Sequence, residues 1–257
     1  MQISNTLIIA GHDPSGGAGI QADIEAVAAA GGHAATLVTA LTCQDTHNVY
    51  DVRITDTDFF ARCLSRLEAD MAFAALKTGV LASIDQVEAV AGFCERHPTV
   101  PVVIDPVLIA SGGGRLAEDS VGKRLRERLI DKATLITPNA REARALCDGQ
   151  DDLDRCGRQL AERAGHVLIT GGDTDGPSVI NRLFTTQGEI ARYEWPRLDG
   201  VFHGSGCTLA ASIAARLAAG MSLEAALSTA QADVHEMLAN AFSAGSGQAI
   251  PDRLSRQ

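Results

Sequence analysis

The feature that most constrains the fold is a regular alternation of short apolar runs with longer amphipathic stretches. Runs with the length and composition of buried strands occur at residues 7–10, 35–41, 74–77, 101–104, 133–137 and 166–170. Stretches with helical periodicity separate them, at residues 20–30, 58–69, 84–95, 120–129 and 153–164. Repeated strand-helix units predict an α/β fold with a mainly parallel, doubly wound sheet that is flanked by helices.

The pattern changes toward the end of the chain. Residues 179–185 and 190–195, joined near Gln187-Gly188, are predicted to form an antiparallel hairpin, and Ala-rich helices are expected at 208–219 and 223–241. Because 46% of the 257 residues are apolar and nothing marks a linker, we expect one domain over residues 1–257. The tail, residues 243–257, carries Gly, Ser and Pro and is expected to be loosely attached.

Charge and composition exclude several classes of partner. The formal net charge of −10 argues against nucleic acid and anionic membranes, because both require patches of Lys and Arg. No apolar run approaches the roughly 20 residues of a membrane span, and the first residues lack the basic start of a secretory signal. The 6 cysteines form no C-x-x-C pair, so neither a zinc site nor a disulfide framework is indicated. We therefore expect a cytoplasmic enzyme.

A glycine turn followed by a thiol stands at the start of the helix expected at 208–219. The residues are His203 and then Gly204-Ser205-Gly206-Cys207. A helix N-terminus leaves several backbone N–H groups unpaired and carries about half a positive charge, so it can hold an anion or lower the pKa of a thiol. The alternative is a tight turn in which Cys207 is only a small buried hydrophobe.

A second glycine loop, residues 11–23, directly follows the first predicted strand. Gly17-x-Gly19-x-x-Ala22 fits the dinucleotide-binding fingerprint, but its first glycine comes well after the strand, and no Gly-Lys-Ser/Thr follows. Without a lysine to grip phosphate, the loop with Asp13 and Asp23 suits a neutral or cationic heteroaromatic ligand better than a pyrophosphate. An oxidoreductase is therefore a distant alternative.

Asn139 and Glu142 follow the strand expected at 133–137 and are spaced to share one face of a first helical turn. One interpretation is a capping box, with Asn139 as the N-cap and Glu142 at N3. The other is a carboxylate that holds Mg²⁺ beside the phosphates of a nucleotide, because hard cations prefer oxygen ligands. Spacing does not decide between them.

Taken together, these segments resemble one known family. In order they are residues 10–23, 39–46, 105–108, Asn139-x-x-Glu142 and 204–208, and they resemble the hydroxymethylpyrimidine/phosphomethylpyrimidine kinases of thiamine biosynthesis, in the ribokinase-like superfamily. The resemblance spans about residues 6–242. Its most discriminating element is Cys207, because most of the superfamily has Asp there. The resemblance implies a ribokinase-like three-layer sandwich with a small β flap near residues 44–52 and no separate lid domain.

The resemblance also implies the reaction and the site. The expected reaction is ATP-dependent phosphorylation of 4-amino-5-hydroxymethyl-2-methylpyrimidine and then of its monophosphate, with Mg²⁺, in a homodimer. Cys207 is expected to act as the base, with the backbone N–H groups of Gly204, Ser205 and Gly206 around the transferred group. The other implied roles are substrate binding by Gly11, Asp13, Ala18, Asp23, Gln44, Val80 and Val107; ATP binding by Asn139, Thr170, Gly172 and Ser205; and metal binding by Asp105 and Glu142.

Departures from the family pattern keep alternatives open. Thr170-Gly171-Gly172-Asp173 stands where the family often has Lys-Gly-Gly-His, so a cation expected near ATP is missing, with Arg182 or Lys123 as candidate replacements. Val80 replaces a common Met and could loosen the pocket for the substrate ring. The alternatives are a pyridoxal or pyridoxine kinase and, from another class, a non-catalytic protein that senses the pyrimidine.

Overall fold

The predicted strands join in one mixed sheet in the computed structural model, which describes residues 3–107 and 119–254. Within these residues the sheet has nine strands in the order β3-β2-β1-β4-β5-β6-β7-β8-β9. The central strands pair in parallel, whereas β3, β8 and β9 are antiparallel to their neighbours. The strands are β1 (Asn5–His12), β2 (His33–Gln44), β3 (Val49–Ile54), β4 (Ala75–Thr78), β5 (Val102–Ile104), β6 (Leu135–Ile136), β7 (Val167–Ile169), β8 (Ser178–Thr185) and β9 (Gly188–Pro196).

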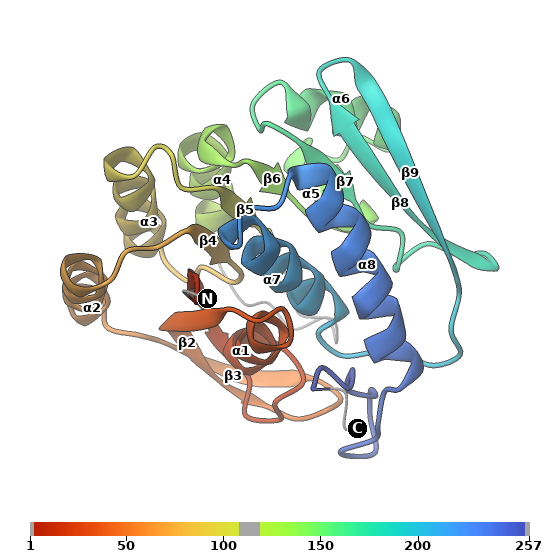
Figure 1. Cartoon of the computed structure of the whole chain (residues 1–257), viewed down its shortest axis with the longest axis horizontal. Helices are drawn as coiled ribbons and strands as arrows, with labels where there is room; N and C mark the ends of the chain where they lie inside the picture. The colour runs from red at the N-terminus through yellow and green to blue at the C-terminus, as the bar shows by residue number, and fades with distance from the viewer. Residues whose placement is uncertain (1–2, 108–118, 255–257) are drawn as a thin grey trace.

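Helices cover both faces of this sheet, which gives the three layers seen in Figure 1. One face carries α1 (Gly19–Ala29), α7 (Ser205–Ala218) and α8 (Leu223–Ala239). The opposite face carries α2 (Thr57–Asp70), α3 (Ile84–Arg96), α4 (Asp119–Arg128), the 3-10 helix η1 (Ile130–Lys132), α5 (Ala140–Leu146) and α6 (Leu153–Ala161). The predicted α/β class with a mainly parallel sheet is confirmed.

Successive side chains of the central strands pack alternately into the two apolar cores, which lie on opposite faces of the sheet. In β5, Val102 and Ile104 pack into the cluster that contains α2 to α6, whereas Val103 between them packs with α7 and α8. In β1, Ile8 packs with α1 and α7 while its two neighbours face the other cluster. A strand that is covered on both faces is apolar at every position, which is why these strands are continuous apolar runs in the sequence.

The order of the strands positions the loops that carry the marked residues. β2 lies on one side of β1 and β4 lies on the other, so the direction of winding reverses at β1. Such a reversal leaves a crevice beyond the carboxyl ends of the strands, where ligands of open α/β sheets bind. Val80 follows β4, Asp105 directly follows β5, and Gly11 lies near the end of β1. The fold therefore brings these loops to one edge of the sheet.

The β flap expected near residues 44–52 corresponds to the end of a hairpin. β2 and β3 pair antiparallel at the edge of the sheet, with Gln44 opposite Val49. Gln44 thus stands close to the turn of the hairpin and beside the crevice.

The prediction of a loosely attached tail is wrong for the part that the structure describes. A bridge joins Phe202 to Ala249, and Arg253 is only 1% exposed. A Cβ on Gly247 would lie 2.3 Å from the carbonyl oxygen of Thr46. The glycines that suggested flexibility instead permit close packing of the tail against the hairpin of β2 and β3.

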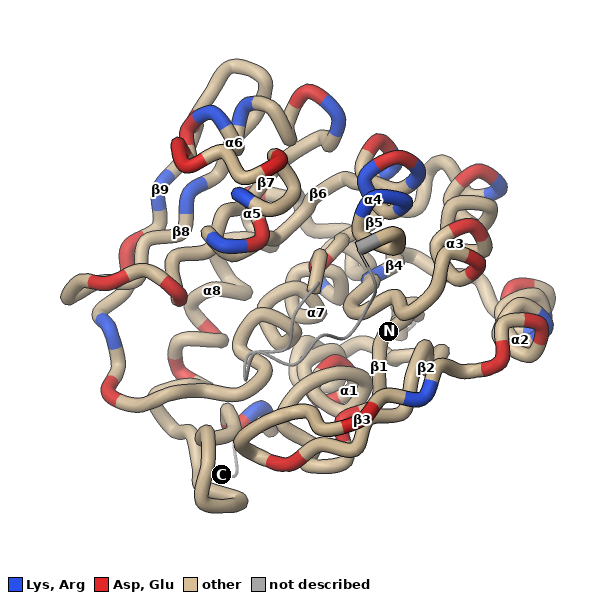
Figure 2. Tube along the Cα trace, turned by 180° about the vertical axis from the view of Figure 1, so that it is seen from behind, with Lys and Arg blue, Asp and Glu red and all other residues tan. Residues whose placement is uncertain are grey.

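Charged residues of both signs are mixed over the helices. Figure 2 shows both basic and acidic residues on α3, α4 and α6, and the basic residues form no continuous band in this view. In the described ranges no helix has both the length and the apolar character to cross a membrane.

Candidate active site

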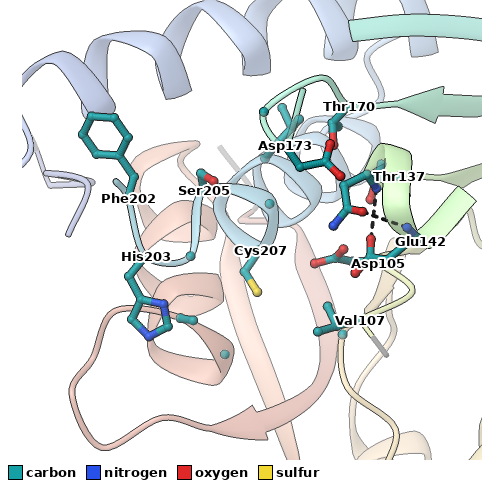
Figure 3. A pocket seen from close by; sticks show the side chains of 18 of the residues that line it. Asp105, Val107, Thr137, Glu142, Thr170, Asp173, Phe202, His203, Ser205 and Cys207 are labelled. Atoms are coloured by element: carbon teal, nitrogen blue, oxygen red, sulfur yellow. Dashed lines mark hydrogen bonds between the residues drawn. The ribbon is translucent and has the colours of Figure 1, made fainter. Parts of the chain in front are cut away.

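One cavity of about 1100 Å³ lies at the carboxyl ends of the parallel strands. Its walls bring together nearly all the residues that the sequence marked, although they come from loops far apart in the chain. Figure 3 shows Cys207 at the start of α7, with His203 on one side and the carboxylate of Asp105 on the other. The predicted residues that line the cavity are Gly11, Asp13, Ala18, Gln44, Val80, Asp105, Val107, Asn139, Glu142, Thr170, Gly172, Gly204, Ser205, Gly206 and Cys207.

Two glycine-rich segments meet in the wall of this cavity. We call residues 15–19 the first glycine segment and residues 204–207 the second glycine segment. Gly204 has a φ of +76°, and a Cβ there would lie 2.0 Å from the carbonyl oxygen of Gly17. A Cβ on Gly17 would lie 2.1 Å from Cδ2 of His203. The glycines are therefore required because the two segments interlock.

The second glycine segment presents the N-terminus of α7 to the cavity. Gly204 is the N-cap and provides no side-chain hydrogen bond to the first turn of the helix. Apart from the adjoining residues and the backbone of the helix itself, no atom of the described residues lies within 4 Å of the position where a Cβ on Gly206 would stand, so a ligand has room there. The unpaired N–H groups and the positive end of the helix dipole suit a phosphoryl group.

The thiol of Cys207 is protonated at neutral pH. Burial raises its pKa to about 12, an effect that the nearby ammonium of Lys77 opposes and the carboxylates of Asp105 and Asp23 reinforce. The expected lowering of its pKa by the helix N-terminus is therefore outweighed by burial.

The predicted role of Asp23 in binding the substrate needs correction, because Asp23 does not line the cavity. Its side chain is 0% exposed, and both carboxylate oxygens lie 2.8 Å from Nζ of Lys77, which is also 0% exposed. Although burial alone would lower it, the carboxylates of Asp23 and Asp105 hold the pKa of Lys77 above its ordinary value. Asp23 and Lys77 thus form a buried ion pair behind Cys207, and Asp23 has no oxygen left to face a substrate amine.

Asp13 joins the first glycine segment to the flap. Its carboxylate accepts hydrogen bonds from the backbone N–H groups of Ser15 and Ala18, at 2.9 and 2.8 Å. Nε2 of His203 lies 2.8 Å from Oδ2 of Asp13 and 2.9 Å from Nε2 of Gln44. Burial opposes the effect, but these hydrogen bonds lower the pKa of Asp13. Asp13 is therefore a negative charge that fixes the loop rather than a free group.

The capping interpretation of Asn139 and Glu142 is confirmed. Oδ1 of Asn139 accepts from the backbone N–H of Glu142 at 2.8 Å, and Oε2 of Glu142 accepts from the backbone N–H of Asn139 at 3.0 Å. Burial raises the pKa of Glu142 to about 8, and the neighbouring carboxylate of Asp105 contributes. The cap does not exclude a second role, because Glu142 also lines the cavity.

Asp105 and Glu142 fit a hard divalent cation. Oδ2 of Asp105 is buried and has no hydrogen-bond partner among the described residues. Burial raises the pKa of Asp105 to about 6 although the ammonium of Lys77 opposes the effect, so a further cation would stabilise this carboxylate. In the described ranges no three acidic, His or Cys side chains form a metal cluster. A cation here would therefore take its remaining ligands from phosphate oxygens and water.

A local contact of Asp173 explains the departure from the family pattern at residues 170–173. Asp173 accepts from the backbone N–H groups of Ala140 and Arg141, at 3.1 and 3.0 Å, and so caps the start of α5. Of the two candidate replacement cations, Lys123 lines the cavity. Arg182 does not, because it pairs with Asp154 and Glu189.

Side chains that the sequence did not mark form a further part of the cavity wall, which we call the second lobe. It is lined by side chains from β8, β9 and α8, among them Asn181, Trp195, Gln231 and His235. The rings of Trp195 and His235 are 5.1 Å apart, and Nε1 of Trp195 is buried without a partner in the described part of the chain. The chain has one Trp, so its position at the end of a strand was the available signal.

A helix N-terminus suited to an anion lies beside the buried carboxylate of Asp105 and the half-buried carboxylate of Glu142. Together with the open edge of a mainly parallel sheet and its β flap, this arrangement is that of a kinase of small molecules with ribokinase-like architecture. Comparison with known proteins gives the family. The family model for phosphomethylpyrimidine kinase matches residues 13–252, and this chain belongs to that family.

Two curated relatives illustrate the match. The hydroxymethylpyrimidine/phosphomethylpyrimidine kinase of Escherichia coli is 41% identical over 222 residues, which cover 84% of this chain and 83% of that protein. A thiamine biosynthesis multifunctional protein of Corynebacterium efficiens is 36% identical over 258 residues, which cover 97% of this chain. The chain spans only about a third of that larger protein, at 35% of its length.

Solved structures extend the likeness to pyridoxal kinases. An ADP complex of Bacillus subtilis pyridoxal kinase superposes with a TM-score of 0.90 at 29% identity, and covers 98% of both chains. A phosphomethylpyrimidine kinase from Clostridium difficile has a TM-score of 0.78 at 28% identity, and covers 91% of this chain and 99% of that one.

Proposed function

We propose that this protein transfers the γ-phosphoryl group of ATP to the hydroxymethyl group of 4-amino-5-hydroxymethyl-2-methylpyrimidine, and then transfers a second group to the monophosphate. The observation that carries the proposal is the shared cavity, in which candidate residues for the ring, the phosphates and the nucleotide meet at the start of α7. The names of the family and of its relatives in thiamine biosynthesis support the choice of substrate.

The nucleotide base occupies the second lobe in this proposal. Trp195 offers a flat apolar face and an unpartnered N–H donor, and Asn181 and Gln231 border the same space. The phosphates then extend past Asn139 toward the second glycine segment. The ADP complex of the related pyridoxal kinase supports a nucleotide in a cavity of this kind.

Backbone N–H groups of the second glycine segment stabilise the charge on the transferred group in this mechanism. They are held in place by the interlocked glycines before any substrate binds, so no reorganisation is needed during the reaction. Mg²⁺ held by Asp105 and Glu142 would supply positive charge to the phosphate oxygens. Phosphoryl transfer depends mainly on such positioning and electrostatics.

Cys207 moves the proton of the alcohol. Because the resting thiol is protonated, it accepts the proton of the hydroxyl only as it passes its own to a neighbour. Asp105 is the candidate acceptor, because its carboxylate lines the same cavity and its charge acts on the thiol. The hydroxyl oxygen bonds to the γ-phosphorus as the bond from that phosphorus to the β,γ-bridging oxygen breaks and ADP leaves. The hydroxyl proton passes to Cys207 while the thiol proton passes to Asp105, so the proton count of Cys207 does not change. This late transfer fits a loose transition state in which the alcohol is activated little beforehand.

Pyridoxal is the second candidate substrate, and two observations favour it. The fold superposes more closely on a pyridoxal kinase than on a phosphomethylpyrimidine kinase, and Val80 leaves a wider ring pocket than a longer side chain would. Because Asp23 is paired with Lys77, selectivity for the aminopyrimidine over pyridoxal depends on Gln44. The side-chain amide of Gln44 offers both a donor and an acceptor to the edge of the ring.

We further propose that the enzyme is a cytoplasmic homodimer. The proposed use of ATP as the phosphoryl donor supports the cytoplasm as the compartment. Apolar side chains on the hairpin and the neighbouring helix support the dimer, because Leu41, Tyr50, Ile54 and Phe59 are 52–64% exposed and close together in the sequence.

The decisive experiment measures ADP release with hydroxymethylpyrimidine, its monophosphate and pyridoxal in parallel. We expect turnover with both pyrimidines and a higher kcat/KM for hydroxymethylpyrimidine than for pyridoxal. Turnover of pyridoxal alone would replace the pyrimidine assignment and keep the kinase. Absence of ADP release with all three, despite tight binding of the pyrimidine, would favour a sensing protein.

A further inference from the structure

We propose that Arg253 is a positioning residue of the active site, whose guanidinium holds the two glycine segments together from behind the cavity wall. The inference rests on the proposed function, because it concerns the same site. Arg253 is among the largest fully buried side chains of the described residues, and its side chain is 0% exposed. It lies in the tail, near the end of the chain, and is not among the residues that line the cavity.

The guanidinium of Arg253 donates in several directions at once. Nε donates to Oγ1 of Thr208 at 2.8 Å, in the first turn of α7. Nη1 donates to a carboxylate oxygen of Glu25 on α1 at 3.0 Å and lies 3.4 Å from the carbonyl oxygen of Gly16, while Nη2 donates to the carbonyl oxygen of Gly17. One rigid planar group thus bonds to the first glycine segment, to α1 and to α7.

The carbonyl oxygen of Gly17 is where these contacts reach the site. It accepts from Arg253, and Gly204 packs directly against it, as the 2.0 Å distance to a Cβ on Gly204 shows. Thr208, the partner of Nε, also donates to the carbonyl oxygen of Gly204 at 2.7 Å. A shift of Gly17 would therefore move Gly204 and with it the N–H groups at the start of α7.

The tail that carries Arg253 also holds the flap. The backbone N–H of Gln248 donates to the carbonyl oxygen of Thr46 at 2.9 Å, and that of Gly247 donates to Oγ1 of Thr46 at 3.1 Å. Nε2 of His47 lies 3.0 Å from Oγ of Ser246. The tail consequently contacts three parts of the cavity wall: the flap, the first glycine segment and α7.

A purely structural arginine would affect stability alone, whereas a positioning residue must change the geometry of the N–H groups. Misplacement of catalytic groups by about 1 Å can lower a rate by about 10²-fold without weakening ground-state binding. Arg253→Met keeps the apolar stem and removes every donor, so it should lower kcat by about 10²-fold while KM for the alcohol changes by less than about threefold. Arg253→Lys keeps the charge and a single donor nitrogen, and it should recover part of the loss.

Arg216→Met is the matched control. Arg216 is also buried, lies on α7, and bonds to the carbonyl oxygen of Ser212 and to Asp233, but it does not contact a glycine segment. It should lower the melting temperature and leave kcat within twofold of wild type. The same variants are compared by amide hydrogen exchange, where Arg253→Met and Arg253→Lys should speed exchange at residues 15–18 and 204–208, and Arg216→Met should not.

The outcomes separate the two proposals. If wild type releases no ADP, the proposed function fails, and the exchange experiment still tests the role of Arg253. If Arg253→Met and Arg253→Lys keep kcat within twofold of wild type, or leave exchange at both glycine segments unchanged, Arg253 is not a positioning residue.

Discussion

Replacement of Lys77 tests the buried ion pair that lies behind Cys207. In Lys77→Met the apolar stem is retained and the ammonium is lost. Asp23, whose side chain is 0% exposed, then lacks the one residue among those described to which its two oxygens hydrogen-bond. Removing one member of a buried ion pair costs about 3–5 kcal/mol, which is roughly 10²- to 10⁴-fold in the folding equilibrium. We expect a loss of free energy of unfolding in this range, measured by urea unfolding with the fluorescence of Trp195.

Two further variants make the measurement specific. The double variant Asp23→Ala/Lys77→Met removes both charges and should lose less stability than Lys77→Met alone, because no uncompensated carboxylate remains. Arg163→Met, which breaks a surface pair with side chains 39% and 57% exposed, should lose less than about 1 kcal/mol. A loss below about 1 kcal/mol in Lys77→Met, or an equal loss in the double variant, would refute the reasoning.

Three other predictions concern the carboxylates and the thiol. Cys207→Ala should lower kcat by about 10²- to 10⁴-fold with little change in the Kd of the alcohol, measured by ADP release and titration calorimetry; near-wild-type turnover would assign Cys207 to packing. Glu142→Gln keeps the capping geometry at N3 but removes the carboxylate charge. The midpoint of urea unfolding should therefore stay within about 0.3 M of wild type, while the Mg²⁺ concentration for half-maximal activity rises. Normal Mg²⁺ dependence with lower stability would leave Glu142 only a cap. Burial raises the pKa of Glu142 from 4.5 to about 8. The folded state therefore binds this proton more tightly than the unfolded state does. The stability that results is complete below pH 4.5 and is lost as the pH rises to about 8. With chelator present, the free energy of unfolding should therefore fall over this range, and a slope that is the same in Glu142→Gln would contradict the assignment.

The sequence predicted those parts of the fold and site whose signal is local. A strand buried on both faces must be apolar throughout, so β1 and β5 were recognisable without knowledge of their neighbours. The loops that follow parallel strands must meet at one edge, so Asp105 and Glu142 could be placed in one cavity. The capping box of Asn139 and Glu142 is likewise a matter of spacing within one turn.

What the sequence did not predict depends on contacts between distant elements. Asp23 lies on α1 and its partner Lys77 lies on β4, and no spacing rule reveals that Lys77 contacts both of its oxygens. The second lobe of the cavity is assembled from β8, β9 and α8, and each contributes only ordinary residues such as Asn181 and Gln231. Glycine in the tail predicted freedom, whereas Gly247 is needed because a backbone oxygen occupies the space of its Cβ.

The long-range contacts of Arg253 and His203 have a consequence for how the enzyme is made. Arg253 bonds to Gly16 across a separation of 237 residues, and His203 bonds to Asp13 across 190. During synthesis the first glycine segment therefore leaves the ribosome long before the two side chains that fix it. The central strands and their helices can form in that interval, whereas we expect the two glycine segments to interlock only after Arg253 has emerged. A chain interrupted before Arg253 should accordingly form its sheet and lack an assembled site.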